Sequence, residues 1–279
     1  MRNTQHESHM AYHMATELNE PATQMPITYL RTLTKTERTD KANRRLGCVL
    51  AFVAGAANAG GFLAVGQYTS HMSGIVSSVA DNLALGKVGL MLAGISSVIA
   101  FAGGAATSAL LINWARGRNA KSGYALPLFF EAILMLCFGL LGSSLCHHRL
   151  LFIPVTIGVL CFAMGLQNAM ITKISKAEIR TTHMTGIVTD IGIELGKLAY
   201  WNRGASSSYV KEGVHADLGR LGLLASLLSM FLFGGLAGAQ GFERVGYISA
   251  IPLAAILLAM AVVPIFDDFY RFQERRTGR

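Results

Sequence analysis

Long stretches of this 279-residue chain lack charged residues altogether. Charged side chains make up 14% of the sequence and hydrophobic ones 52%. Five stretches contain no Asp, Glu, Lys or Arg: 46–70, 88–115, 150–172, 221–242 and 245–266. Each exceeds the roughly 20 residues with which a helix crosses ~30 Å of hydrocarbon. A sixth stretch, 125–146, has Glu131 as its single charge, so the sequence predicts a polytopic membrane protein.

Other patterns that the sequence lacks narrow the class of membrane protein further. The apolar stretches lack the alternation of membrane β-strands and are rich in Ala, Leu and Gly, which indicates helices. The four cysteines have no metal-site or disulfide spacing, and the chain has no phosphate-binding loop for ATP. We therefore expect no enzyme activity, no cofactor, no resident metal and no nucleic-acid partner. The net charge of +8 indicates cytoplasmic loops instead.

One short motif occurs twice in the chain. The block Ser-His-Met-Ser-Gly-Ile-Val-Ser at 70–77 returns as Thr-His-Met-Thr-Gly-Ile-Val-Thr at 182–189. An Asn-Ala pair precedes each copy, and a Leu-Gly-Lys follows each copy. Because these three features keep the same order, the sequence indicates an internal duplication.

The expected fold is all-α, with two membrane repeats and a polar segment at each end. The predicted domains are a disordered cytoplasmic tail at 1–45, a first membrane repeat at 46–146, a second at 147–268 and a basic C-terminal tail at 269–279. The predicted spans are 46–66, 88–114, 125–146, 151–172, 221–240 and 247–266. Two further helices, 71–85 and 182–197, begin at the motifs.

Two topologies are compatible with this pattern. If the motif helices are re-entrant or strongly tilted, there are six spans and two inverted repeats of three; if they cross, there are eight spans and two parallel repeats of four. With the N-terminus inside, the six-span arrangement leaves 3 of the 24 Lys and Arg outside and the eight-span arrangement leaves 7. The excess of cytoplasmic Lys and Arg in membrane proteins favours six spans. We expect a multi-pass inner-membrane protein with both termini in the cytoplasm.

The two motifs are also the candidate site. A helix that starts inside the membrane offers unpaired backbone N–H groups and the positive end of its dipole to an anion or polar solute. The candidate substrate-binding residues at the motifs are His71, Ser70, Ser73, His183, Thr182 and Thr185. Polar residues on the neighbouring helices complete the set: Asn58, Asn168, Gln167, Asp81 and Asp190. The two histidines could bind solute or carry a proton.

Small residues predict where the helices meet. We expect Thr69 or Ser70 to cap the first motif helix, and Gly74 and Gly186 to let the two motif helices cross closely. Gly-Gly patches within 88–114 and 221–240 predict further backbone contacts, with Gly104 and Gly235 at equivalent positions. We expect the side chain of Glu131 to extend toward the cytoplasmic surface.

Three functions remain open at this point. The first is a transporter or channel for a small polar or anionic solute or ion. Its expected partners are the lipid bilayer and a second copy of the chain. The second is a metal or haem protein in which His71 and His183 are paired ligands. The third is a membrane scaffold or regulator, since Ser, Thr and Gly at a helix start are also ordinary capping and packing residues.

The motifs together resemble the YoaK-type family of bacterial membrane proteins, a domain of unknown function. The resemblance covers about residues 46 to 268 and rests on four segments: GAANAGGF at 55–62, HMSG at 71–74, GLQNA at 165–169 and THMTG at 182–186. It implies a membrane protein with no established substrate. In the family the position of Asn58 is often Asp, and the position of Ser73 is often Thr.

Overall fold

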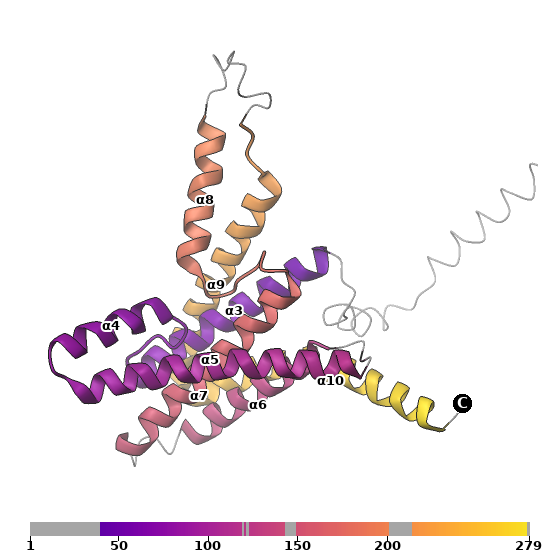
Figure 1. The fold of residues 1–279 in the computed structure, drawn as a ribbon, viewed down its shortest axis with the longest axis horizontal. Helices are drawn as coiled ribbons and strands as arrows, with labels where there is room; N and C mark the ends of the chain where they lie inside the picture. The colour runs from indigo at the N-terminus through magenta and orange to yellow at the C-terminus, as the bar shows by residue number, and fades with distance from the viewer. Residues whose placement is uncertain (1–39, 119, 121–122, 143–148, 201–213, 278–279) are drawn as a thin grey trace, which may run out of the picture.

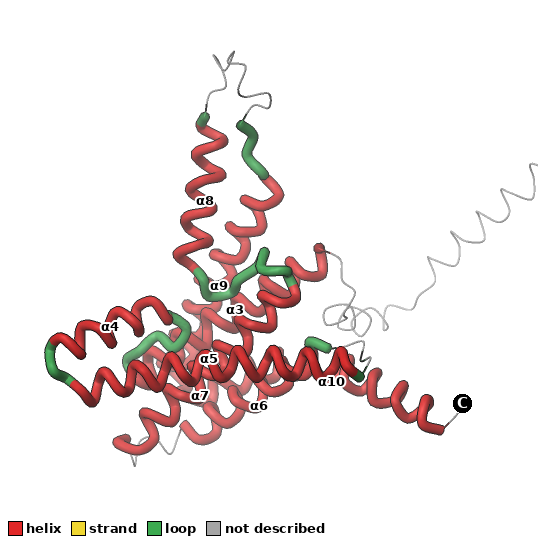
Figure 2. The backbone as a smooth tube through the Cα atoms, in the orientation of Figure 1, coloured by secondary structure: helices red, strands yellow, loops and turns green. Residues whose placement is uncertain are grey.

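The computed structural model describes residues 40–118, 120, 123–142, 149–200 and 214–277, and all regular structure within them is helical (Figures 1 and 2). The helices of the first half are α3 (Asp40–Val65), α4 (Met72–Ala84), α5 (Val88–Gly117) and α6 (Ala125–Leu141). Those of the second half are α7 (Arg149–Ile174), α8 (Met184–Ala199), α9 (Leu218–Val245) and α10 (Ala250–Thr277), with the short 3-10 helix η2 (Gly246–Ser249) before α10. The prediction of an all-α protein is confirmed.

Long apolar helices account for most of the described chain. Four regions are long and apolar enough to cross a membrane: Lys41–Val65, Val88–Gly117, Ile153–Ile174 and Leu218–Tyr270, the last of which covers both α9 and α10. The apolar part of α6, Ala125–Leu140, is shorter. Large apolar side chains such as Ile99, Leu110 and Leu232 are exposed on these helices, as lipid contact requires. This chain is therefore a helical membrane protein.

The motif helices are shorter than the candidate membrane spans. With 13 residues, α4 measures about 20 Å, and α8 has 16 residues. Each forms a hairpin with the helix that follows it, because α4 packs on α5 and α8 packs on α9. Gly86, with a φ of +68°, makes the tight turn between α4 and α5, where an L-residue would be strained. In Figure 1 the two hairpins project from the core in different directions.

The two halves pack on each other reciprocally. α3 makes its most extensive contact with α9, and α5 with α7, so the first helix of each half lies against the third helix of the other. α6 packs on α10, which are the last helices of the two halves. The apolar core therefore lies between the halves, and neither half encloses a core of its own.

Glycines allow two of these helix pairs to touch at the backbone. A Cβ atom on Gly104 of α5 would collide with the carbonyl oxygen of Phe162 in α7, and one on Gly234 of α9 with that of Phe52 in α3. At Gly235 the nearest atom would be an ordinary 3.8 Å away. The equivalent of Gly104 is therefore Gly234, and the assignment of this contact to Gly235 was wrong by one residue.

The predicted terminal segments differ from the helices found. The expected disordered tail, 1–45, lies outside the described residues up to position 39, but its last six residues belong to α3, which begins at Asp40. The predicted basic tail, 269–279, is not a separate segment either, since α10 continues to Thr277. Both helices extend past their apolar stretches, because helix propensity does not end where hydrophobicity does.

Candidate functional site

A single pocket of about 690 Å³ is lined by both copies of the motif. Residues 70–73 line it from the first half and residues 182–185 from the second half, so His71 and His183 face a common space. Asn58 of α3 and Asn168 of α7 line it as well. The volume lies within the range of about 300–1,000 Å³ that is usual for small-molecule sites.

The two asparagines hold the segments that lead into the motif helices. The Oδ1 atom of Asn58 accepts hydrogen bonds from the backbone N–H and the hydroxyl of Ser70, at 3.3 and 3.1 Å. The Oδ1 atom of Asn168 accepts one from the hydroxyl of Thr182 at 2.8 Å. Each asparagine therefore positions the residue directly before the motif histidine. The hydroxyls of Ser70 and Thr182 are engaged in these bonds and do not cap the helices.

The histidines themselves occupy the N-cap positions of α4 and α8, and neither histidine side chain caps its helix by a hydrogen bond. The expected capping by Thr69 or Ser70 is thus wrong. A Cβ on Gly74 would collide with the ring of His71, and one on Gly186 with the ring of His183, and α4 and α8 make no extensive contact with each other. The two glycines make room for the imidazoles over the first helical turn and are not helix-crossing points, contrary to expectation.

Phe101 and Phe231 line the pocket from the third helix of each half. A Cβ on Gly165 of α7 would collide with the carbonyl oxygen of Phe101, and one on Gly55 of α3 with that of Phe231. Close backbone contact between α5 and α7 and between α3 and α9 therefore places one aromatic ring on each side of the pocket.

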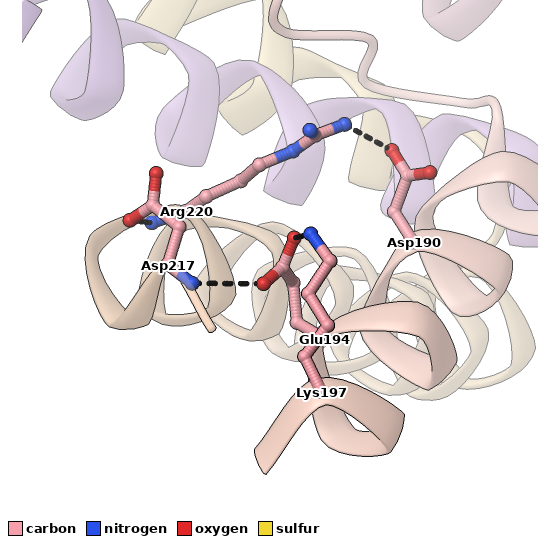
Figure 3. Close-up of polar contacts among 5 residues, drawn as sticks. All are labelled: Asp190, Glu194, Lys197, Asp217 and Arg220. Carbon is pink, nitrogen blue, oxygen red and sulfur yellow. Dashed lines mark hydrogen bonds and ion pairs between the residues drawn. The ribbon is translucent and has the colours of Figure 1, made fainter. Parts of the chain in front are cut away.

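Asp81 and Asp190 do not line the pocket. Asp81 is exposed on α4, and Asp190 of α8 forms an ion pair with Arg220 of α9, at 2.9 Å between Oδ2 and Nη2 (Figure 3). Below it in the same hairpin, hydrogen bonds from Lys197 and from the Asp217 amide lower the pKa of Glu194, which lies outside the candidate spans. Asp190 and Glu194 therefore join α8 to α9, and neither of the predicted ligands Asp81 and Asp190 lies in the pocket lining.

Two other polar side chains lie inside the helical core. Gln167 is fully buried and donates a hydrogen bond to the Leu50 carbonyl at 2.8 Å, which joins α7 to α3 outside the pocket lining. Glu131 is fully buried in α6, and neither of its oxygens has a partner among the described residues. The expectation that Glu131 reaches the surface is wrong, because its face of α6 is the one that packs against neighbouring helices.

Sequence reasoning missed several residues that complete the pocket: Tyr68, Met72, Phe101, Thr172, Arg180, Met184 and Phe231. A usable signal existed for two of them. Tyr68 precedes Ser70 by two positions, as Arg180 precedes Thr182, so the repeat relates them although their side chains differ. Phe101 and Phe231 lie in uniformly apolar helices, where nothing distinguishes a pocket residue from a lipid-facing one.

The donors in the pocket suit hydrogen bonding better than metal coordination. Two imidazoles, hydroxyls and amides line it, whereas a bound Zn²⁺ needs three or four protein ligands. No group of three or more His, Cys, Asp or Glu close enough to hold a metal occurs in the part of the chain that the structure describes.

A family model described as "Protein of unknown function (DUF1275)" matches residues 46–263. The chain belongs to the DUF1275 family. The match confirms the resemblance to the YoaK-type membrane proteins and covers all pocket-lining residues. No curated protein and no solved structure matches the chain.

Proposed function

We propose that this member of the DUF1275 family is a transporter or channel, not an enzyme, for a small polar or anionic solute. The proposal is carried by one observation: the duplicated motifs, 112 residues apart in sequence, line one pocket from opposite halves of the molecule. A packing motif has no need of a shared cavity. A binding site built from two half-sites needs one.

The proposed architecture is a pair of inverted three-span repeats in the inner membrane, with both termini in the cytoplasm. The reciprocal contacts of α3 with α9 and of α5 with α7 support a two-fold relation between the halves, which exchanges these two pairs, and the distribution of Lys and Arg favours its inverted form. The backbone contacts of Gly104 and Gly234 are exchanged in the same way. In this arrangement α4 and α8 are re-entrant or tilted helices that begin at the site, as in transporters with discontinuous helices.

The helix starts supply the binding chemistry. The first N–H groups of a helix have no partner within the helix, and the side chains at the N-cap positions of α4 and α8 make no capping hydrogen bond to them. Those groups lie beside the pocket together with His71 and His183, so a solute with acceptor atoms meets donors from both halves. Shielding from water by the membrane strengthens such bonds.

The test begins with a thermal-shift screen of the purified full-length protein in neutral detergent against anions, amino acids, nucleobases and metal ions. The compound with the largest shift is then followed by flux into proteoliposomes. His71→Ala and His183→Ala should each reduce flux about tenfold or more, because each removes a hydrogen bond to the solute. The double variant should lose less than the product of the two effects, since both act on one site.

The matched control is His215→Ala, an exposed histidine that does not line the pocket, which should leave flux unchanged. A haem band in the absorption spectrum or a stoichiometric bound metal would contradict the proposal in favour of a ligand role for the histidines. Folded protein that shows no flux and no shift with any compound would leave a scaffold as the function.

A further inference from the structure

The pocket carries charge of one sign. Arg180 lines it, no Asp or Glu does, and the two helix starts add the positive ends of their dipoles. The guanidinium of Arg180 forms no hydrogen bond or ion pair with any part of the chain that the structure describes. An exposed arginine beside a cavity, with no partner among the described residues, can bind an oxyanion through two parallel hydrogen bonds.

The loop before α8 holds Arg180 at the pocket edge. Ile179 is buried in the core, where its side chain lies against the position of Gly47. The buried hydroxyl of Ser175 accepts a hydrogen bond from the Ile179 N–H at 2.9 Å and lies 3.2 Å from its carbonyl oxygen. With Ile179 anchored in this way, the next residue is fixed at the surface of the pocket.

The first half has no counterpart of this cation. Tyr68 stands where the repeat would place an arginine, and its ring stacks on Phe62 at a centroid distance of 4.6 Å. Phe62 follows Asn58 by four residues, just as the smaller Thr172 follows Asn168. The contributions of the two halves to the pocket therefore differ: the first half supplies Tyr68, and the second half supplies Arg180 and Thr172.

The rest of the lining is apolar enough for an organic ligand. Phe101, Phe231, Met72 and Met184 line the cavity, and its volume of about 690 Å³ exceeds what a bare inorganic ion would fill. Methionine side chains adapt to irregular apolar shapes, and aromatic rings offer flat surfaces.

We propose that the solute is a small organic anion whose carboxylate or similar oxyanion group binds Arg180 at one end of the pocket, while its apolar body lies between Phe101 and Phe231. This inference rests on the proposed function and names the class of solute for the same pocket. Arg180 is the residue that selects for negative charge.

The experiment compares matched acids and amides by thermal shift of the full-length protein in neutral detergent. The pairs are acetate with acetamide and benzoate with benzamide, and sulfate and phosphate serve as inorganic anions. Benzoate should stabilise the protein more than benzamide and more than either inorganic ion. Arg180→Gln should weaken benzoate binding about tenfold or more and abolish the preference over benzamide, whereas Arg180→Lys should retain part of it.

Lys176→Gln, which removes a nearby exposed cation that does not line the pocket, should leave benzoate binding unchanged. If benzamide binds as well as benzoate and His71→Ala weakens both, the pocket stands and the assignment to an anion is overturned. If His71→Ala changes the thermal shift with none of the probes, the proposed function itself is contradicted. Stabilisation only by phosphatidylglycerol in nanodiscs, or by none of these probes, would also overturn the inference.

Discussion

The two asparagines beside the pocket hold equivalent segments of the chain through different hydrogen bonds. Asn58 uses only its carbonyl oxygen, which accepts two hydrogen bonds from Ser70. Asn168 uses both ends of its amide, because its Nδ2 also donates to the Met164 carbonyl at 2.8 Å. A carboxylate can replace the first asparagine as an acceptor but cannot replace the donor of the second.

Asn58→Asp should therefore retain folded yield and unfolding temperature, and Asn168→Asp should lower both. The loss at position 168 is expected at about 1–3 kcal/mol, because a carboxylate would face the Met164 carbonyl with no donor between them. Thermal unfolding of the purified variants in detergent measures the difference. Equal losses at the two positions would show that the amide donor of Asn168 contributes nothing.

At the level of the helix, contact depends on which side of the backbone a glycine faces. Successive residues of a helix point about 100° apart, so two adjacent glycines approach the same partner at different distances. In α5, a Cβ on Gly104 would collide with the Phe162 carbonyl of α7, whereas one on Gly103 would lie an ordinary 3.8 Å from the ring of Phe162. In α9, a Cβ on Gly234 would collide with the Phe52 carbonyl of α3, whereas one on Gly235 would lie 3.8 Å from the Gly55 carbonyl oxygen.

This difference predicts opposite outcomes for neighbouring substitutions. Gly104→Ala and Gly234→Ala should each destabilise the protein by about 1–3 kcal/mol, because the added methyl meets a backbone carbonyl that cannot move alone. Gly103→Ala and Gly235→Ala should be neutral or stabilising by up to about 1 kcal/mol, from better helix propensity. Unfolding temperatures of the four variants provide the comparison, and a loss at Gly235 as large as at Gly234 would contradict the assigned contact.

At the scale of the whole molecule, the distribution of charge predicts the orientation in the membrane. The six-span arrangement keeps all but 3 of the 24 Lys and Arg on the cytoplasmic side. Among the described residues, neither α4 nor α8 is long and apolar enough to count as a candidate span, but the apolar part of α6 is not either. The distribution of charge is therefore the observation that favours the proposed inverted repeats.

Single cysteines on a cysteine-free background test this topology. Positions 122 and 206 should react only with reagents that reach the cytoplasm, and position 148 should react from outside; all three lie outside the described residues. The impermeant reagent is applied to intact and to opened cells, so that unreactive and inaccessible positions are distinguished. External labelling at position 122 would favour eight spans and remove the inverted-repeat argument.

Much of this protein could be predicted from the sequence because helix formation in a membrane is a local property. A run of 20 or more uncharged residues is sufficient to define a span, and the expected spans at 46–66, 88–114 and 151–172 lie within α3, α5 and α7, apart from Gly66 at the end of the first. The repeated His-Met-Ser/Thr-Gly motif is likewise visible without any structure. Asn58 and Asn168 can also be identified from the sequence, since a polar residue is easily recognised within a long apolar stretch.

The tertiary structure decided what those features do. Whether Asp190 faces the pocket or Arg220 depends on how α8 turns against α9, and that contact joins residues 30 positions apart. Gly74 and Gly186 make room for the histidine rings, because α4 and α8 make no extensive contact with each other in the fold. Only the fold identifies Arg180 as a candidate binding residue, because it brings this residue to the pocket that both motifs line. Local composition determines which segments are helical. The direction in which each side chain points depends on packing between segments that are distant in sequence, and local composition does not encode that packing.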